Sequence, residues 1–172
     1  MDYPSLKPSD RALVDAFMSR RRLLQAAAAG GLALGMLHFV KTPEIEAQAL
    51  AGNRLYDQLG GLAGITAVMN DFAINLANDS RISHFFVSLP PLRLHRLEEL
   101  LIQQVSAASG GPVTYTGTDM KSAHEGLNIT MDDFNALVED LVAALDKQGV
   151  STGAKQTLLG ALAPLAGDIV TA

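Results

Sequence analysis

The sequence predicts an all-α fold, and three observations carry that prediction. Apolar residues recur at helical spacing in four long segments, and no segment shows the alternation of a half-buried strand. Hydrophobic residues make up 48% of the chain and aromatic residues only 5%, so Leu, Ala and Val dominate the expected core. A chain of 172 residues accommodates one domain plus an appendage.

Composition also narrows the chemistry. The chain has no Cys, which excludes disulfides, thiolate-held metal centres and thiolate nucleophiles. Its formal net charge of -5 speaks against nucleic acid as a partner. The sequence shows no Ser/His/Asp arrangement, phosphate-binding loop or His-x-x-x-His zinc pattern. Nothing therefore supports hydrolase or kinase activity.

Residues 1–49 have the pattern of a targeting segment. Arg20 and Arg21 lie within Ser-Arg-Arg-Arg-Leu-Leu-Gln, and the apolar run Ala26–Val40 follows. That run is shorter than the roughly 20 residues that span a bilayer comfortably. An Ala-x-Ala pattern ending at Ala49 then suits signal cleavage. The segment is similar to twin-arginine signals and predicts a periplasmic protein. An uncleaved inner-membrane anchor and a cytoplasmic amphipathic extension are the alternatives.

The folded domain is predicted over residues 52–172. A short helical turn over Leu55–Leu59 is stopped by Gly60 and Gly61. The first long helix follows and ends at Asn78-Asp79-Ser80. Its apolar face is made of residues at helical spacing, namely Ile65, Val68, Met69, Phe72, Ala73 and Leu76.

The second long helix is expected after a loop at Pro90 and Pro91. Its apolar positions include Leu94, Leu97, Leu101 and Val105. Because Gly110, Gly111 and Pro112 break helices, the second helix ends there.

The third and fourth long helices make up the C-terminal part of the domain. Thr130 and Asp133 resemble a capping box, with Asp in the usual Glu place, and Gly149 closes the helix that they begin. The last helix begins near Thr152, and Pro164 is expected to bend it or loosen one turn. From the residues alone, these segments describe a plain four-helix bundle.

The stretch from Gly110 to His124 holds a single histidine between two helices. Neutral imidazole is a good metal donor, so His124 suits a metal or haem ligand. A surface or capping histidine is the alternative that the residues alone leave open.

Several separated motifs resemble the group 1 truncated haemoglobins. They are Tyr56-Asp57-x-x-Gly60-Gly61, Asp71-Phe72, Asp79-Ser80-Arg81-Ile82-x-His84-Phe85-Phe86, Gly-Gly-Pro-x-x-Tyr-Thr-Gly-x-x-Met-Lys-x-x-His ending at His124, and the closing Leu-Ala-Pro-Leu. The resemblance covers about Leu55 to Val170. It implies a shortened globin, a two-over-two helical sandwich around a haem.

The resemblance also implies roles for individual residues. His124 is expected to be the proximal ligand of a haem b iron, with Leu97 and Leu101 facing the iron from the opposite side. Phe86 is expected to stack on the porphyrin, with Phe72 and Met120 lining the pocket. The remaining candidates, expected to hold the haem propionates, are Arg96, Lys121, Tyr115 and Arg93. Ordinary core packing and surface solvation are the competing explanations for these residues.

The chain departs from the best-known members of that family on the distal side. Ala73 stands where those members have a Tyr, and Leu97 and Leu101 stand where a Gln is expected. Gln104 is the one polar residue near that face. His95 is expected on a different helix face from Leu97, so it should not reach the iron.

Two other histidines are assigned away from the iron. His84 is expected to be structural, and His38 lies in the signal segment.

The resemblance predicts a haem protein that binds O2, CO or NO reversibly. A haem enzyme for NO dioxygenation or peroxide reduction is the alternative, and a helical interaction module without a cofactor is the third. The expected partners are a diatomic gas and an unidentified reductase. Membrane contact is expected only through the N-terminal segment, if that segment stays uncleaved.

Overall fold

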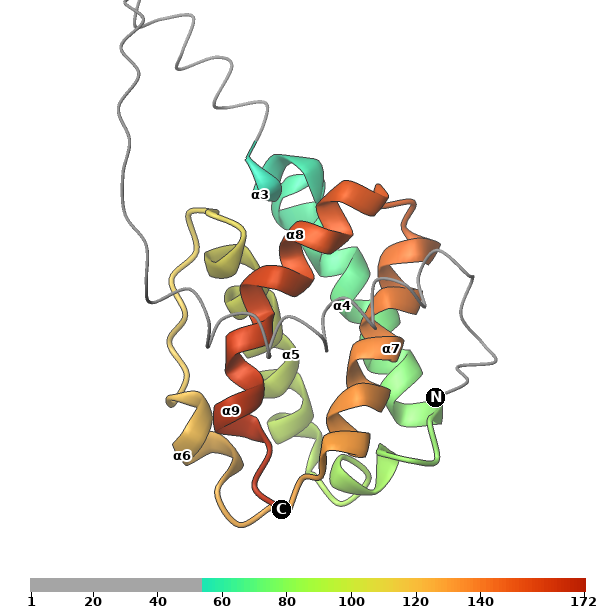
Figure 1. Cartoon of the computed structure of the whole chain (residues 1–172), viewed down its shortest axis with the longest axis vertical. Helices are drawn as coiled ribbons and strands as arrows, with labels where there is room; N and C mark the ends of the chain where they lie inside the picture. Colours follow the sequence, from blue (N-terminus) through green and yellow to red (C-terminus); the bar gives the residue numbers. More distant parts are fainter. Residues whose placement is uncertain (1–53) are drawn as a thin grey trace, which may run out of the picture.

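The computed structural model describes residues 54–172, and every regular element in that range is helical (Figure 1). The predictions for residues 1–49 lie outside the described residues. The four long helices are α4 (Gly61–Asn78), α5 (Pro91–Ala108), α7 (Met131–Lys147) and α8 (Thr152–Leu162). The short elements are α3 (Leu55–Gln58), η1 (Ser83–Phe85), α6 (Met120–His124), η2 (Ala163–Leu165) and α9 (Ala166–Ile169). The all-α prediction is confirmed.

The turn between α3 and α4 depends on glycine. Gly60 and Gly61 have φ angles of 82° and 63°, in a region that residues other than glycine rarely adopt. These two glycines therefore allow a tight turn between the end of α3 and the start of α4, as the sequence predicts. The backbone N–H of Tyr56 donates to the carbonyl of Ser109 at 3.0 Å, which ties α3 to the end of α5.

Proline marks the start of α5, and glycine follows its end. The sequence predicts a loop at Pro90 and Pro91, but α5 begins at Pro91. Proline is tolerated in the first helical turn because the backbone N–H groups there have no partner within the helix. At the other end Gly110 has a φ angle of 78°. A Cβ on Gly111 would lie 2.4 Å from the Tyr56 ring, so the close approach of α3 requires glycine there.

The C-terminal helices form as the sequence predicts. Thr130 and Asp133 make a reciprocal capping box at the start of α7, and hydrogen bonds from Thr130 hold the pKa of the Asp133 carboxyl below its usual range. Pro164 lies in η2, which interrupts the helical run between α8 and α9. Both the capping box and the break at Pro164 are confirmed.

The core lies between α4 and its neighbours. Helix α4 packs against α5 and α7, and α5 packs against α8, so two pairs of helices form the sandwich (Figure 1). Most of the fully buried apolar side chains come from α4, α7 and α8, including Ile65, Met69, Val142, Leu145 and Leu158. Each such side chain contributes about 1.5–3 kcal/mol when buried. Among the described residues, no helix is both long and apolar enough to cross a membrane.

Replacing either of two helical glycines with alanine is expected to change the stability of the protein, in opposite directions at the two positions. In Gly64→Ala, the new Cβ would lie 2.0 Å from the backbone oxygen of Leu59, so we expect a loss of about 3 kcal/mol of stability. In Gly153→Ala, the Cβ meets nothing within 4 Å, so we expect a gain of about 0.4–1 kcal/mol. Urea unfolding of the two variants measures both changes, and a Gly64→Ala variant as stable as Gly153→Ala would contradict the packing of α3 on α4.

Candidate functional site

A short helix with its own cap carries His124. The Asp119 side chain accepts a hydrogen bond from the backbone N–H of Ser122 at 2.9 Å, which caps α6 and holds the pKa of Asp119 below its usual range. Helix α6 packs against α9 (Figure 1). A capped helix held by a neighbour fixes the position of His124 at its last residue.

The orientation of the His124 ring is set by one hydrogen bond. Its Nδ1 lies 2.7 Å from the backbone oxygen of Met120. A carbonyl oxygen can only accept, so Nδ1 carries the proton and donates. The other ring nitrogen, Nε2, then keeps a free lone pair, which is the form in which histidine binds a metal. The ring is half-buried, which suits a ligand better than a solvated surface group.

A cavity of about 360 Å³ lies between α4 and α5. Its lining is mostly apolar and comes from α4, from the residues after η1 and from α5. The lining residues are Ala73, Leu76, Ala77, Phe86, Val87, Leu94, His95, Leu97, Glu98 and Leu101. The structure thus brings Phe86, Leu97 and Leu101 together with Ala73, as the resemblance implies.

The apolar face of α5 is incompletely covered by protein. Of its predicted apolar positions only Val105 is buried, whereas Leu94 is 41% exposed and Leu97 and Leu101 are half-buried. Leaving such a stripe open is unusual for a core helix. A flat apolar cofactor beside α5 would cover it, and the residues present fit that requirement.

The candidates for propionate binding lie outside this cavity. The Arg96 guanidinium donates to Thr116 Oγ1 at 3.0 Å and pairs with Glu99 at 2.9 Å. Tyr115 donates its hydroxyl to the backbone oxygen of Thr118 at 2.9 Å, and burial raises its pKa. Arg93 and Lys121 are exposed.

Phe72 and His95 lie differently with respect to this cavity. Phe72 is only 2% exposed and belongs to the hydrophobic core, and its expected place in the lining of a haem pocket stays a prediction. His95 was expected on a different face from Leu97, but both line the cavity. The physical reason is that the cavity extends along α5 and takes in neighbouring positions at its mouth, where His95 is 68% exposed.

Met120 and Gln104 also lie outside the residues that line the cavity. Met120 is half-buried on α6, where its backbone oxygen holds His124. Gln104 is likewise half-buried.

Sequence reasoning missed Glu98, which also lines the cavity. A signal was present, because Glu98 lies four residues after Leu94 and three before Leu101 and so shares their helix face. Among the described residues, no group of three or more His, Asp or Glu side chains could hold a metal ion.

Comparisons with known proteins agree with this geometry. The model of the bacterial-like globin family matches residues 54–171. The chain is 36% identical to the group 1 truncated hemoglobin GlbN of Mycolicibacterium paratuberculosis, over 68% of this chain and 84% of that protein. It is 32% identical to the GlbN of Synechocystis sp., over 66% of this chain and 89% of that protein.

A solved structure shows the same fold. The Fe(III) form of a Tetrahymena pyriformis truncated hemoglobin variant superimposes with a TM-score of 0.65 at 25% identity, and the match covers 70% of this chain and all (100%) of that one. The matched helices, the capped histidine and the uncovered apolar face of α5 converge on one family. The chain belongs to the group 1 truncated haemoglobins, haem-binding proteins of the bacterial-like globin family.

Proposed function

We propose that this protein binds haem b through His124 Nε2 and binds a diatomic gas reversibly. The observation that carries the proposal is the hydrogen bond from His124 Nδ1 to the Met120 carbonyl, which leaves Nε2 free for iron. A bound haem supplies an iron with an open sixth position for O2, CO or NO. Family membership supports a haem-binding globin, and the choice of haem and ligand is our inference.

The cavity between α4 and α5 has the chemistry of a gas-binding pocket. Ala73, Leu97 and Leu101 give it apolar walls that offer no hydrogen-bond donor. Phe86 supplies an aromatic wall for stacking. We assign the propionate contacts to Arg96, Lys121 and Tyr115, which provide cationic and hydroxyl donors.

One observation favours a second function. His95 and Glu98 line the same cavity, so two groups able to move protons lie at its edge. That arrangement suits a haem enzyme for NO dioxygenation or peroxide reduction. Such an enzyme requires an unidentified reductase as a partner.

Rapid mixing of the reduced, haem-loaded protein with O2, CO and NO tests the proposal. We expect O2 and CO to bind and be released with recovery of the starting spectrum. We expect NO to be consumed only once per haem in the presence of O2. Repeated NO turnover with an added reductant would instead support the enzyme.

We also propose that residues 1–49 export the domain to the periplasm. The pair Arg20-Arg21 ahead of the apolar run Ala26–Val40 supports a twin-arginine signal. In a bacterial host we expect a periplasmic product shortened near Ala49. Replacing both arginines with Lys should keep the protein inside the cell, because the export machinery reads the arginine pair.

Cell fractionation and the mass of the product measure this export. Matched replacement of Arg22 by Lys, next to the pair, should leave export unchanged. A full-length product that fractionates with the membrane would support the anchor instead.

A further inference from the structure

Hydrogen bonds at Thr116 hold the connection between α5 and α6 against α5. Residues 112–119 form no helix and lead from the end of α5 to the helix that carries His124. The Gln103 side-chain oxygen accepts hydrogen bonds from the Thr116 backbone N–H and from its hydroxyl, both at 2.9 Å. The Arg96 guanidinium donates to the same hydroxyl oxygen at 3.0 Å.

Two sides of α5 serve different parts of the molecule. Leu97 and Leu101 line the cavity, whereas Gln103 does not. Because Gln103 is two residues after Leu101, the two side chains leave the helix on nearly opposite sides. Arg96 and Gln103 are seven residues apart and share one side. The helix that forms one wall of the cavity therefore also holds the connection to α6.

A turn with its own hydrogen bonds joins Thr116 to α6. Tyr115 donates its hydroxyl to the backbone oxygen of Thr118 at 2.9 Å, and a Cβ on Gly117 would clash with that hydroxyl. The Asp119 cap of α6 follows directly. Because the turn is internally bonded, whatever holds Thr116 also holds the start of α6.

The connection has little else to hold it in place. None of the residues 112–119 is buried. Exposed segments with few buried contacts open locally at low cost in free energy. The hydrogen bonds to Gln103 therefore decide how readily the connection separates from α5.

We propose that Gln103 is a positioning residue for His124, which it holds in place relative to α5 through Thr116 and α6. The proposal rests on the proposed function, in which His124 binds the haem iron. By restricting the movement of α6, Gln103 slows the loss of haem. In both bonds to Thr116 its side chain acts only as an acceptor, so a carboxylate can replace the amide.

Gln103→Met and Gln103→Glu are the matched test variants, because methionine is a weak acceptor and glutamate keeps the acceptor oxygen. In the haem-loaded full chain, we expect Gln103→Met to release haem to apomyoglobin about fivefold faster or more, since two hydrogen bonds are lost. Its Fe–His stretching band in ferrous resonance Raman spectra should shift or broaden. The Thr116 amide N–H should exchange faster with solvent. Gln103→Glu should retain the wild-type values.

Gln104→Met is the control on the same helix. Gln104 is half-buried like Gln103 but is not a partner of Thr116, so this variant should keep the wild-type values. Arg96 is unsuitable as a probe, because it is also a candidate for the haem propionates.

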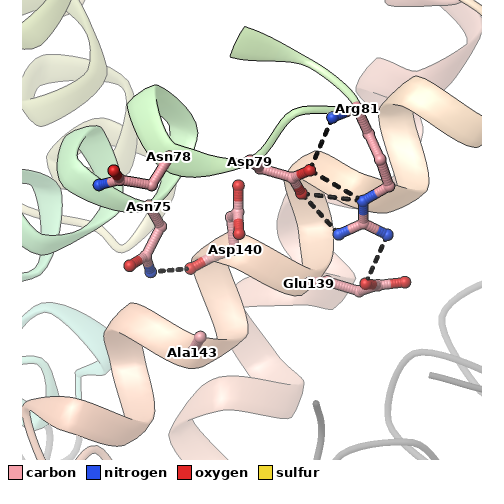
Figure 2. Close-up of a pocket in the computed structure, with 7 residues that line it drawn as sticks. All are labelled: Asn75, Asn78, Asp79, Arg81, Glu139, Asp140 and Ala143. Atoms are coloured by element: carbon pink, nitrogen blue, oxygen red, sulfur yellow. Dashed lines mark hydrogen bonds and ion pairs between the residues drawn. The ribbon is translucent and has the colours of Figure 1, made fainter. Parts of the chain in front are cut away.

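A tie on another side of the molecule controls for general loss of stability. The Arg81 guanidinium contacts the Asp79 carboxylate at 2.6 Å and the Glu139 carboxylate at 2.9 Å (Figure 2). These residues, with Asp140, line a polar pocket between α4 and α7 that shares no lining residue with the gas-binding cavity. Arg81→Gln should lower the urea concentration at which the protein unfolds but leave haem release and the Fe–His band unchanged.

Haem release and an Fe–His band in Gln103→Met that match the wild type would overturn the proposal. Equal changes in Gln103→Glu or Gln104→Met, or a shifted Fe–His band in Arg81→Gln, would overturn it as well. A wild-type chain without any ferrous Fe–His band would instead refute the proposed function, and this proposal with it.

Discussion

Replacing His124 with alanine is expected to abolish the axial bond between the protein and the haem iron. Loss of a partner that merely orients a metal ligand costs about 10- to 100-fold in affinity, so loss of the ligand itself should cost at least as much. No other histidine among the described residues lies on α6, where the bond to Met120 holds the imidazole. We expect the Soret band to shift and the haem to dissociate readily in gel filtration. Added imidazole should restore a ligated spectrum.

Two matched variants distinguish ligation from general damage. His84→Ala and His95→Ala remove imidazoles that α6 does not carry, and both should retain the wild-type Soret spectrum. Far-ultraviolet circular dichroism of His124→Ala should match the wild type after haem removal from both. An unchanged Soret band in His124→Ala would show that another group holds the iron.

Introducing a hydroxyl into the gas-binding cavity is expected to slow O2 release. Ala73, Leu97 and Leu101 line that cavity and offer no donor to a polar ligand. A missing hydrogen bond is worth about 1–3 kcal/mol, or roughly tenfold to over a hundredfold in affinity. His95 also lines the cavity, but its side chain is 68% exposed and its Nε2 lies 3.3 Å from the Glu99 carboxylate, outside the lining. The wild type should therefore release O2 fast and oxidise readily, and it should prefer CO. Ala73→Tyr should slow O2 dissociation at least about tenfold, with a smaller change for CO.

Stopped-flow O2 and CO dissociation rates test this prediction. Ala73→Phe is the control, because it adds the same ring without the hydroxyl and should leave fast O2 release. Gln104 lies outside the cavity lining, so Gln104→Ala should change nothing. Slow O2 release in the wild type that is lost in Gln104→Ala would identify Gln104 as the donor. Slow release that persists in that variant would contradict the apolar cavity.

The helices were predictable because local chemistry determines them. Apolar spacing defines α4 and α7, and the Thr130–Asp133 capping box and the left-handed glycines Gly60 and Gly149 mark their ends. The sequence places Pro91 in a loop because proline breaks helices, although the first helical turn tolerates proline.

The sites were less predictable because they depend on how helices pack. His95 and Leu97 are neighbours in sequence, but only the packing of α5 on α4 shows that one cavity reaches both. Glu139 and Asp140 lie on an apolar-patterned helix, and nothing local shows that Arg81 faces them. The assignment of His124 came from family resemblance, while the protonation of its ring required the hydrogen bond to Met120.

Absorption spectra of the purified protein, titrated with haem, test the central claim most directly. With one equivalent of haem, we predict a Soret band in the ferric form, a five-coordinate ferrous spectrum with His124 as the axial ligand, and a sharp shift on adding CO. If added haem produced no Soret band beyond that of free haem, the protein would be a helical module without this cofactor. That result would contradict the account.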